Sequence, residues 1–289
     1  MKTEVKKIDS TKREISIQIG GEVVKNKFDS VYKKIAKDAK VPGFRPGNAP
    51  RDILEKHYSS YAHQQVLEEL IPLVYNQAIE KEGLDVVELP EIFDVKLDQQ
   101  NLSFKARVEV TPEIPVRNYK GIKIEYKKIN VSVEEIKSAV EAIKESRKAE
   151  AVDDSLAKGL GYPNLTELKN ALERQIYLQK ENLQRTKIEN ELLERITKDL
   201  DFKLPEALLK RQLEELLRQA KLDLALKGLS SEKIEQEEKS LSEQLQPQAK
   251  KQVKIYLVLA AIAKNENIPL DDQMPRRVME FLLRQADWQ

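Results

Sequence analysis

The chain contains no cysteine and only two histidines among its 289 residues. Without cysteine it can form neither a disulfide framework nor a Cys-ligated zinc site, and it has no thiol nucleophile. His57 and His63 are six residues apart, so they do not share a helix face. Glycine is scarce, at nine residues, and aromatic residues make up 6% of the chain. We therefore expect no metal and no cofactor.

Long apolar runs are also absent. No stretch of about 18 apolar residues occurs, which predicts that no transmembrane helix is present. The first twenty residues lack the uninterrupted apolar core of a signal peptide, so we expect a cytoplasmic protein with no membrane partner. The 50 Lys and Arg residues and 49 Asp and Glu residues give a formal net charge of +1. That balance excludes attraction of the whole molecule to nucleic acid, although a local basic patch is still allowed.

The hydrophobic pattern of the first third predicts an α+β domain. Alternating apolar residues predict strands, and apolar residues three and four apart predict helices. The expected elements are a strand at 15–19, a helix at 24–39, a long helix at 53–79 that Pro72 should kink or divide, and a hairpin of strands at 85–97 and 102–110. Gly83 is a suitable residue to end the long helix. We assign residues 1–111 to this domain.

The remainder predicts a linker followed by helices. Residues 112–153 begin with a stiff two-proline connector and continue as a strand at 121–129. Ser132 and Glu135 form a capping box that should start a helix. Residues 154–289 predict an extended all-α domain. Its expected helices cover 165–196, 205–227, 231–267 with a break at Pro247, and 270–287.

Catalytic motifs are missing from the sequence. It has no HExxH, GxSxG, GxGxxG or P-loop pattern. Its many carboxylates lie on highly charged helices, where such residues are usually solvated. We therefore expect a binding protein rather than an enzyme.

The segment VPGFRPGNAP (41–50) is the most distinctive feature of the chain. Gly43 and Gly47 allow tight backbone geometry, and Arg45 offers a planar fork of donors for a carboxylate or phosphate. An exposed aromatic residue beside an arginine, here Phe44 beside Arg45, is typical of a binding hot spot. The alternative is that Phe44 packs inward and Arg45 only solvates a turn.

Positive charge is concentrated around this segment. Residues 25–56 contain nine Lys or Arg against four Asp or Glu, a local surplus of five. Residues 1–111 as a whole contain 18 of each. A basic surface around the loop could therefore contact phosphates.

The leucine stripes of 165–267 allow two interpretations. They could bury against one another as an ordinary bundle core, or part of the apolar surface could stay open as a binding face. The candidate contact residues on this face are Leu208, Leu209, Leu213, Leu216, Leu217, Ile255, Leu257 and Leu259, and burial must decide among them.

The loop resembles the signature of trigger factor, a family of bacterial ribosome-associated chaperones. That signature is approximately G-F-R-x-G-K-x-P, and here it stands as Gly43-Phe44-Arg45-Pro46-Gly47-Asn48-Ala49-Pro50. Four later segments resemble the family's C-terminal domain in the same order, namely LAKGLGYPNLTELKNAL (156–172), LPEALLKRQLEELLRQ (204–219), AKKQVKIYLVLAAIAKNENI (249–268) and MEFLLRQADW (279–288).

Three departures from the family pattern affect what the resemblance implies. Family members usually carry an FKBP-like prolyl isomerase domain after the linker helix, whereas here Asp153 runs straight into the helical domain. The resemblance therefore implies that isomerase activity is absent. The C-terminal domain is short between Ile268 and Met279, which predicts a smaller substrate cradle. Asn48 replaces the lysine of the signature and removes one cation.

The resemblance implies an ATP-independent chaperone that docks at the ribosomal exit tunnel. Its partners would be a tunnel-exit ribosomal protein, ribosomal RNA, and nascent or unfolded polypeptides; a weakly associating homodimer is also compatible with the family. The implied ribosome-binding residues are Gly43, Phe44, Arg45, Pro46, Gly47, Asn48, Lys33, Lys37 and Lys40. The three lysines could compensate for the lost cation through RNA phosphates.

Three other functions remain open from the sequence. A holdase or assembly chaperone that does not depend on the ribosome would suppress aggregation without ribosome affinity. A helical scaffold with one fixed partner would bury its leucine stripes fully. A residual prolyl isomerase would turn over a proline peptide at ordinary enzyme rates.

Overall fold

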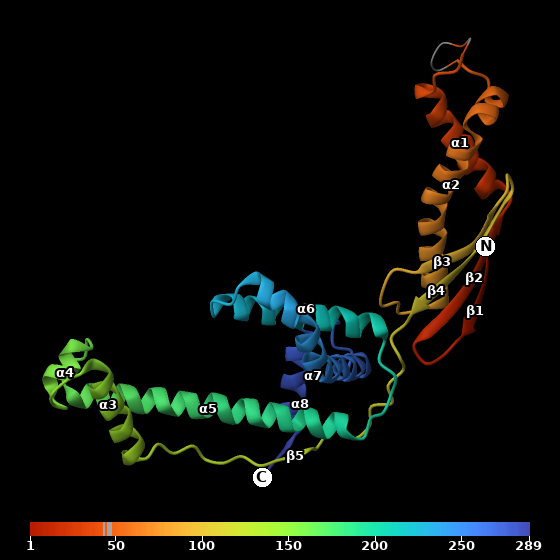
Figure 1. Cartoon of the computed structure of the whole chain (residues 1–289). Helices are drawn as coiled ribbons and strands as arrows, with labels where there is room; N and C mark the ends of the chain where they lie inside the picture. The colour runs from red at the N-terminus through yellow and green to blue at the C-terminus, as the bar shows by residue number, and fades with distance from the viewer. Residues whose placement is uncertain (43, 45–47) are drawn as a thin grey trace. The chain divides into compact units, whose positions relative to one another are not determined.

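The computed structural model describes residues 1–42, 44 and 48–289, and its chain divides into two compact units. One unit contains Met1–Ile114 and Asp201–Leu257, and the other contains Pro115–Leu200 and Val258–Gln289. The predicted fold class, an α+β N-terminal region followed by helices, is confirmed (Figure 1). In this division residues 201–257 lie in the same unit as the N-terminal sheet, whereas the sequence placed them with the rest of 154–289.

The N-terminal sheet is antiparallel, with strand order β1-β2-β4-β3. Its strands are β1 (Lys2–Lys7), β2 (Lys12–Gly20), β3 (Glu91–Leu97) and β4 (Asn101–Glu109). β2 and β4 pair along their whole length, from Lys12 opposite Glu109 to Gly20 opposite Asn101. Alternate residues of these two strands are buried, as the sequence pattern predicted. β1 was not predicted, because its sequence KTEVKK holds one apolar residue and gives no alternation signal.

Two helices, α1 (Glu22–Asp38) and α2 (Arg51–Glu82), share a core with this sheet, and α2 runs beside it in Figure 1. Gly83 ends α2 in the left-handed conformation, with φ of 61°, as predicted. Pro72 does not divide α2, which continues through it. Helical geometry is lost instead at Tyr58, while the neighbours of Pro72 on the helix, Leu70 and Val74, are buried. Their packing holds the helix together across the proline.

The second unit is built around α5 (Leu165–Lys198), a long helix with α3 (Val133–Arg147) and α4 (Asp154–Gly159) at one end (Figure 1). The predicted capping box is present: the Glu135 N–H donates to Ser132 Oγ at 3.3 Å, and Glu135 Oε2 accepts from the Ser132 N–H at 2.8 Å. The three helices share a small core of Val140, Ala157, Leu168 and Leu172.

The strand predicted at 121–129 is reduced to β5 (Lys123–Ile124). It pairs in parallel with β6 (Asp287–Trp288), which follows α8 (Met274–Gln285). The side chains of Tyr126 and Trp288 meet edge to face, with ring centroids 6.3 Å apart. The partner strand lies more than 160 positions away in the sequence, so no local pattern could indicate this pairing.

The remaining helices are α6 (Glu206–Leu226) and α7 (Ser231–Asn265). Gly228 follows α6 with φ of 87°, as expected for a residue that ends a helix. The break predicted at Pro247 is wrong, because α7 continues through it. Ala249 and Val253, just beyond the proline, are buried, and their packing offsets the lost backbone hydrogen bond.

Candidate functional site

The loop 41–50 connects α1 to α2, and its described residues place Phe44 at the surface. Val41 is buried in the domain core, and its carbonyl accepts a hydrogen bond from the Phe44 N–H at 3.1 Å. The Phe44 residue is 40% exposed, so it does not pack inward. Gly43, Arg45, Pro46 and Gly47 lie outside the described residues, while Asn48 is exposed.

The three lysines predicted to contact RNA on the loop's basic flank are all exposed. They are Lys33, Lys37 and Lys40, and within the described part of the chain no ion pair neutralises them. Lys27 and Lys34 behave differently, because both pair with Glu69 of α2, at 2.6 and 2.9 Å. Hydrogen bonds from Lys27 and then Lys34 lower the pKa of Glu69 to about 2. Lys33, Lys37 and Lys40 therefore leave unpaired charge at the surface, while Lys27 and Lys34 join α1 to α2.

Burial separates the predicted contact leucines into two groups. On α6 the five leucines are all half-buried, and no residue of that helix is fully buried. On α7, Ile255 is half-buried, whereas Leu257 and Leu259 are only 2% and 4% exposed. Leu257 and Leu259 were wrongly predicted as contact residues, because core side chains offer no open surface.

Other apolar side chains are exposed that the sequence pattern did not predict. Tyr177, Leu178 and Leu183 project from α5, where Leu183 is 71% exposed. Leu222 and Leu226 project from the C-terminal end of α6, and Tyr256 from α7. A cavity of about 820 Å³ lies beside Tyr177 and Leu178. Tyr177 and Leu178 lie off the stripe formed by Leu168, Leu172 and Ile176, and that offset is a sequence signal that could have identified them.

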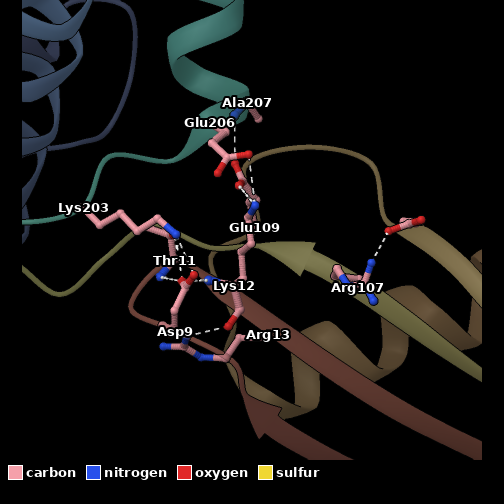
Figure 2. Close-up of polar contacts among 10 residues, drawn as sticks. Asp9, Thr11, Lys12, Arg13, Arg107, Glu109, Lys203, Glu206 and Ala207 are labelled. Carbon is pink, nitrogen blue, oxygen red and sulfur yellow. Dashed lines mark hydrogen bonds and ion pairs between the residues drawn. The ribbon is translucent and has the colours of Figure 1, made fainter.

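The start of α6 is attached to the end of β4 by a buried carboxylate (Figure 2). Glu109 Oε2 accepts a hydrogen bond from the backbone N–H of Ala207 at 2.8 Å. Lys12 Nζ lies 3.6 Å from Glu109 Oε1 and 3.0 Å from Glu206 Oε2. The N-cap residue of α6 is Pro205, which has no side-chain acceptor. Glu109 therefore satisfies an N–H that the helix cannot satisfy itself.

A second attachment lies at the β1–β2 turn, also drawn in Figure 2. Asp9 Oδ2 accepts from Lys203 Nζ at 2.7 Å, and Asp9 Oδ1 accepts from the N–H groups of Thr11 and Lys12, both at 2.8 Å. The hydrogen bond from Lys203, followed by that from the Thr11 N–H, holds the pKa of Asp9 well below its usual range. Both attachments lie within the unit that contains the sheet and residues 201–257.

Within residues 1–42, 44 and 48–289, no group of three or more His, Asp or Glu side chains could hold a metal ion. In the same ranges no helix has the length and apolar character needed to cross a membrane. His63 packs edge to face against Phe28, with ring centroids 5.1 Å apart. The described residues instead present Phe44 at the surface of the loop and helices with exposed apolar side chains.

Comparison with protein families matches most of the chain to one family. A family model described as bacterial trigger factor protein matches residues 1–143. A second, described as the C-terminus of bacterial trigger factor protein, matches residues 164–287. The unmatched residues between them surround the position where the linker meets the helical region.

Individual relatives agree with the family models. The trigger factor of Geobacillus kaustophilus is 23% identical over 384 residues, covering 97% of this chain and 90% of that protein. The trigger factor of Syntrophotalea carbinolica is 35% identical over 127 residues, but the match spans only 43% of this chain and 29% of the relative. A solved structure of the trigger factor chaperone, described in terms of promiscuous substrate recognition in folding and assembly, is 14% identical with a TM-score of 0.58. The match covers 98% of this chain and 93% of the solved chain, so the two chains share a similar fold.

The fold, the open helical faces and these matches together define a molecular chaperone. The chain belongs to the trigger factor family, since the two family models account for nearly all of it.

Proposed function

We propose that this protein is an ATP-independent chaperone of the cytoplasm that docks at the ribosomal exit tunnel through loop 41–50. Arg45 pairs with an acidic group on a ribosomal protein at the tunnel rim, and Phe44 supplies an apolar anchor. Lys33, Lys37 and Lys40 contact the phosphates of ribosomal RNA. Asn48 replaces a lysine of the family signature, so one charged contact is lost. An exposed charged contact contributes roughly 0–1 kcal/mol, so docking is weaker by about that amount.

The exposure of Phe44 is the observation that carries this proposal. A phenylalanine that served the core would be buried, as Phe28 and Phe104 are. Holding a large apolar ring in water costs free energy that a partner surface recovers on binding. Lys33, Lys37 and Lys40 precede the loop on an exposed basic flank and form no ion pair with the described residues, which suits an acidic or phosphate-bearing partner.

The helical surfaces supply the second half of the function, which is holding nascent or unfolded polypeptides. The exposed tyrosine and leucines of α5 and the half-buried and exposed leucines of α6 offer apolar contacts. Charged residues surround them and keep a loaded complex soluble. Many weak contacts fit this task, because a nascent chain must leave again in order to fold.

We also propose that the protein lacks prolyl isomerase activity. The alignment with the Geobacillus kaustophilus protein runs over 384 residues, which is longer than this 289-residue chain. That relative therefore contains residues with no counterpart here. The stretch between the two family-model matches, after residue 143 and before residue 164, is where the absent segment would be inserted.

Cosedimentation with ribosomes tests the docking proposal. The double variant Phe44→Ala/Arg45→Ala should bind ribosomes about 10-fold more weakly than the unaltered chain, because it removes the aromatic anchor and the fork of donors. Binding should also weaken as salt is raised, since the lysine contacts release counterions. Leu73→Ala is the matched control, because Leu73 is a similarly exposed apolar residue on α2 of the same domain. Equal binding by the double variant and the control would refute docking through the loop.

A ribosome-independent holdase is the alternative. It predicts suppression of aggregation by a protein that does not cosediment with ribosomes at any salt concentration. A scaffold with one fixed partner is disfavoured, because it predicts fully buried leucine stripes, whereas no residue of α6 is fully buried.

A further inference from the structure

Residues 127–131 lie between β5 and α3 and have the character of a strand without a strand partner. The sequence pattern predicts a strand at 121–129, but β5 contains only Lys123 and Ile124. Beyond β5 the chain continues without turn or bend up to the start of α3, along the trace that joins these two elements in Figure 1. We call residues 127–131 the extended segment. In the described part of the chain no strand pairs with it.

Burial alternates along the extended segment. Ile129 and Val131 are half-buried, whereas Lys128 and Asn130 are exposed. Successive side chains of a strand point to opposite faces, so this period of two is what a strand with one covered face shows. Isoleucine and valine also favour the extended backbone, because their branched side chains are stiff. Local sequence and burial therefore both suit the segment to strand pairing.

The backbone of the extended segment has one edge in use and one edge open. Lys180 of α5 donates from Nζ to the Asn130 carbonyl at 2.7 Å. Successive carbonyls of an extended chain point to opposite edges, so those of Ile129 and Val131 are directed away from this contact. Within residues 1–42, 44 and 48–289, the backbone groups of Ile129 and Val131 form no hydrogen bond. An unpaired edge of this kind is a template for another extended chain.

A cavity of about 820 Å³ lies beside the extended segment. Its apolar lining comes from Ile129 and Val131 of the segment and from Tyr177 and Leu178 of α5. Both α5 side chains are exposed, Tyr177 by 41% and Leu178 by 55%. The rest of the lining is polar and consists of Asn130, Asn170, Glu173 and Arg174. The volume falls within the roughly 300–1,000 Å³ that is usual for ligand pockets, so it has room for a large apolar side chain.

The open backbone edge and the cavity together select the kind of occupant. A backbone edge recognises another extended backbone, and a neighbouring pocket adds contacts to alternate side chains of that chain. A folded protein offers few such segments, because its backbone groups are already paired. A small ligand could fill the cavity but would leave the backbone edge without a partner. An unfolded polypeptide offers an unpaired backbone and exposed apolar side chains at the same time.

We propose that the extended segment binds a client, meaning an unfolded polypeptide, by strand addition. The client backbone pairs with the open edge of Ile129 and Val131, and one of its large apolar side chains enters the neighbouring cavity. The inference rests on the proposed function, because it specifies how clients are held beside α5. Main-chain pairing lets one site hold clients of many sequences, since nearly every residue carries the same N–H and C=O groups. Each hydrogen bond contributes little net free energy, so the client can leave again.

Substitutions at Ile129 separate main-chain pairing from apolar contact. Ile129→Ala removes the side chain but keeps the backbone N–H, whereas Ile129→Pro removes both and is still compatible with an extended backbone. The probe is a short fluorescein-labelled peptide in which valine and phenylalanine alternate with serine, and fluorescence anisotropy measures its binding. Ile129→Pro should bind it about 10-fold more weakly than Ile129→Ala, the factor expected for one hydrogen bond.

Lys128→Pro is the matched control, because it places a proline in the same segment but removes an N–H from the edge that faces α5. It should bind the peptide as the unaltered chain does. Equal binding by Ile129→Pro and Ile129→Ala would overturn strand addition, as would a failure of the peptide to bind the unaltered chain.

A second measurement needs no substitution in the protein. A peptide of the same sequence with N-methylated backbone amides keeps its side chains but cannot donate hydrogen bonds, so it should bind at least about 10-fold more weakly. Binding of the unmethylated peptide should slow amide hydrogen exchange at Ile129 and Val131 but not at Lys128. Equal affinity for the two peptides, or unchanged exchange at Ile129 and Val131 in the complex, would refute the proposal.

Failure of this inference is distinguishable from failure of the proposed function. If the chain does not suppress aggregation of an unfolded protein, its proposed client-holding function fails, while the peptide measurements still decide whether the extended segment pairs with another chain. If the chain suppresses aggregation but Ile129→Pro and Ile129→Ala bind the peptide equally, only strand addition fails.

Discussion

Glu109 caps the N-terminus of α6, a role that the side chain of a helix's own N-cap residue usually fills. The N-cap residue Pro205 has no side-chain acceptor, and the carboxylate of Glu109 accepts the Ala207 N–H in its place. A negative charge at a helix N-terminus is also favoured by the helix dipole. Because the Glu109 side chain is only 8% exposed, water cannot easily replace it. A single side chain of the sheet thus stabilises the start of a helix nearly 100 residues later.

Glu109→Ala should therefore lower the free energy of unfolding by about 1–2 kcal/mol, the usual cost of losing a helix cap together with a buried hydrogen bond. The substitution leaves the Ala207 N–H without its acceptor and removes one of two carboxylates near Lys12. Denaturant titration followed by circular dichroism measures the change.

Glu91→Ala is the control for this prediction. Glu91 also pairs across the sheet, with Arg107 at 2.9 Å, but both side chains are exposed. Glu91→Ala should lower the free energy of unfolding by less than about 0.5 kcal/mol, because exposed ion pairs contribute little. Equal losses in the two variants would mean that the cap on α6 has no special importance.

At the scale of elements, α5 and α6 bury only part of their apolar surface. α5 contributes Leu168, Leu172, Ile188 and Leu192 to buried positions, yet Tyr177, Leu178 and Leu183 between them stay exposed. α6 contributes no buried residue at all. Helices of this kind are held in place by one face, and we expect the exposed apolar side chains of the other face to bind clients.

Substitution of the exposed α5 residues tests that interpretation. Tyr177→Ser/Leu178→Ser/Leu183→Ser should weaken suppression of aggregation of an unfolded client, since each apolar side chain gains roughly 1–3 kcal/mol on full burial. The unfolding midpoint should change little, because these side chains are already exposed. Light scattering of a denatured client diluted into the chaperone measures suppression.

The matched control is Gln175→Ser/Gln179→Ser, which changes exposed polar residues on the same stretch of α5. If this control loses as much suppression as the apolar variant, apolar contact on α5 is not what holds clients.

Helix ends were easier to predict than helix interruptions. Ser132 with Glu135, Gly83 and Gly228 act through hydrogen bonds and dihedral angles within a few residues, so their sequence signals were sufficient. Pro72 and Pro247 carry an equally clear local signal, but both helices continue through them. Packing of buried neighbours outweighs one lost hydrogen bond, and that packing is not visible in a local pattern. The bend at Tyr58 has no sequence signal that we can name.

At the scale of the whole molecule, the chain is shorter than the alignment that relates it to a full-length family member. We expect no catalysis of prolyl isomerisation as a result. A proline peptide should relax at its uncatalysed rate, over tens of seconds at 25 °C, when this protein is present. A known prolyl isomerase added to the same assay is the positive control. Acceleration to ordinary enzyme rates by this chain would show that isomerase activity is retained.

The sequence by itself determined the family, the α+β and helical regions, and the loop that carries the signature. These depend on residue identity and on spacings of a few positions, which local patterns record. The tertiary structure decided which side chains remain open. It buried Leu257 and Leu259, exposed Phe44 and Leu183, and joined Glu109 to Ala207 and Arg51 to Asp29. Burial and long-range pairing depend on contacts between segments far apart in the chain, and no local pattern contains them.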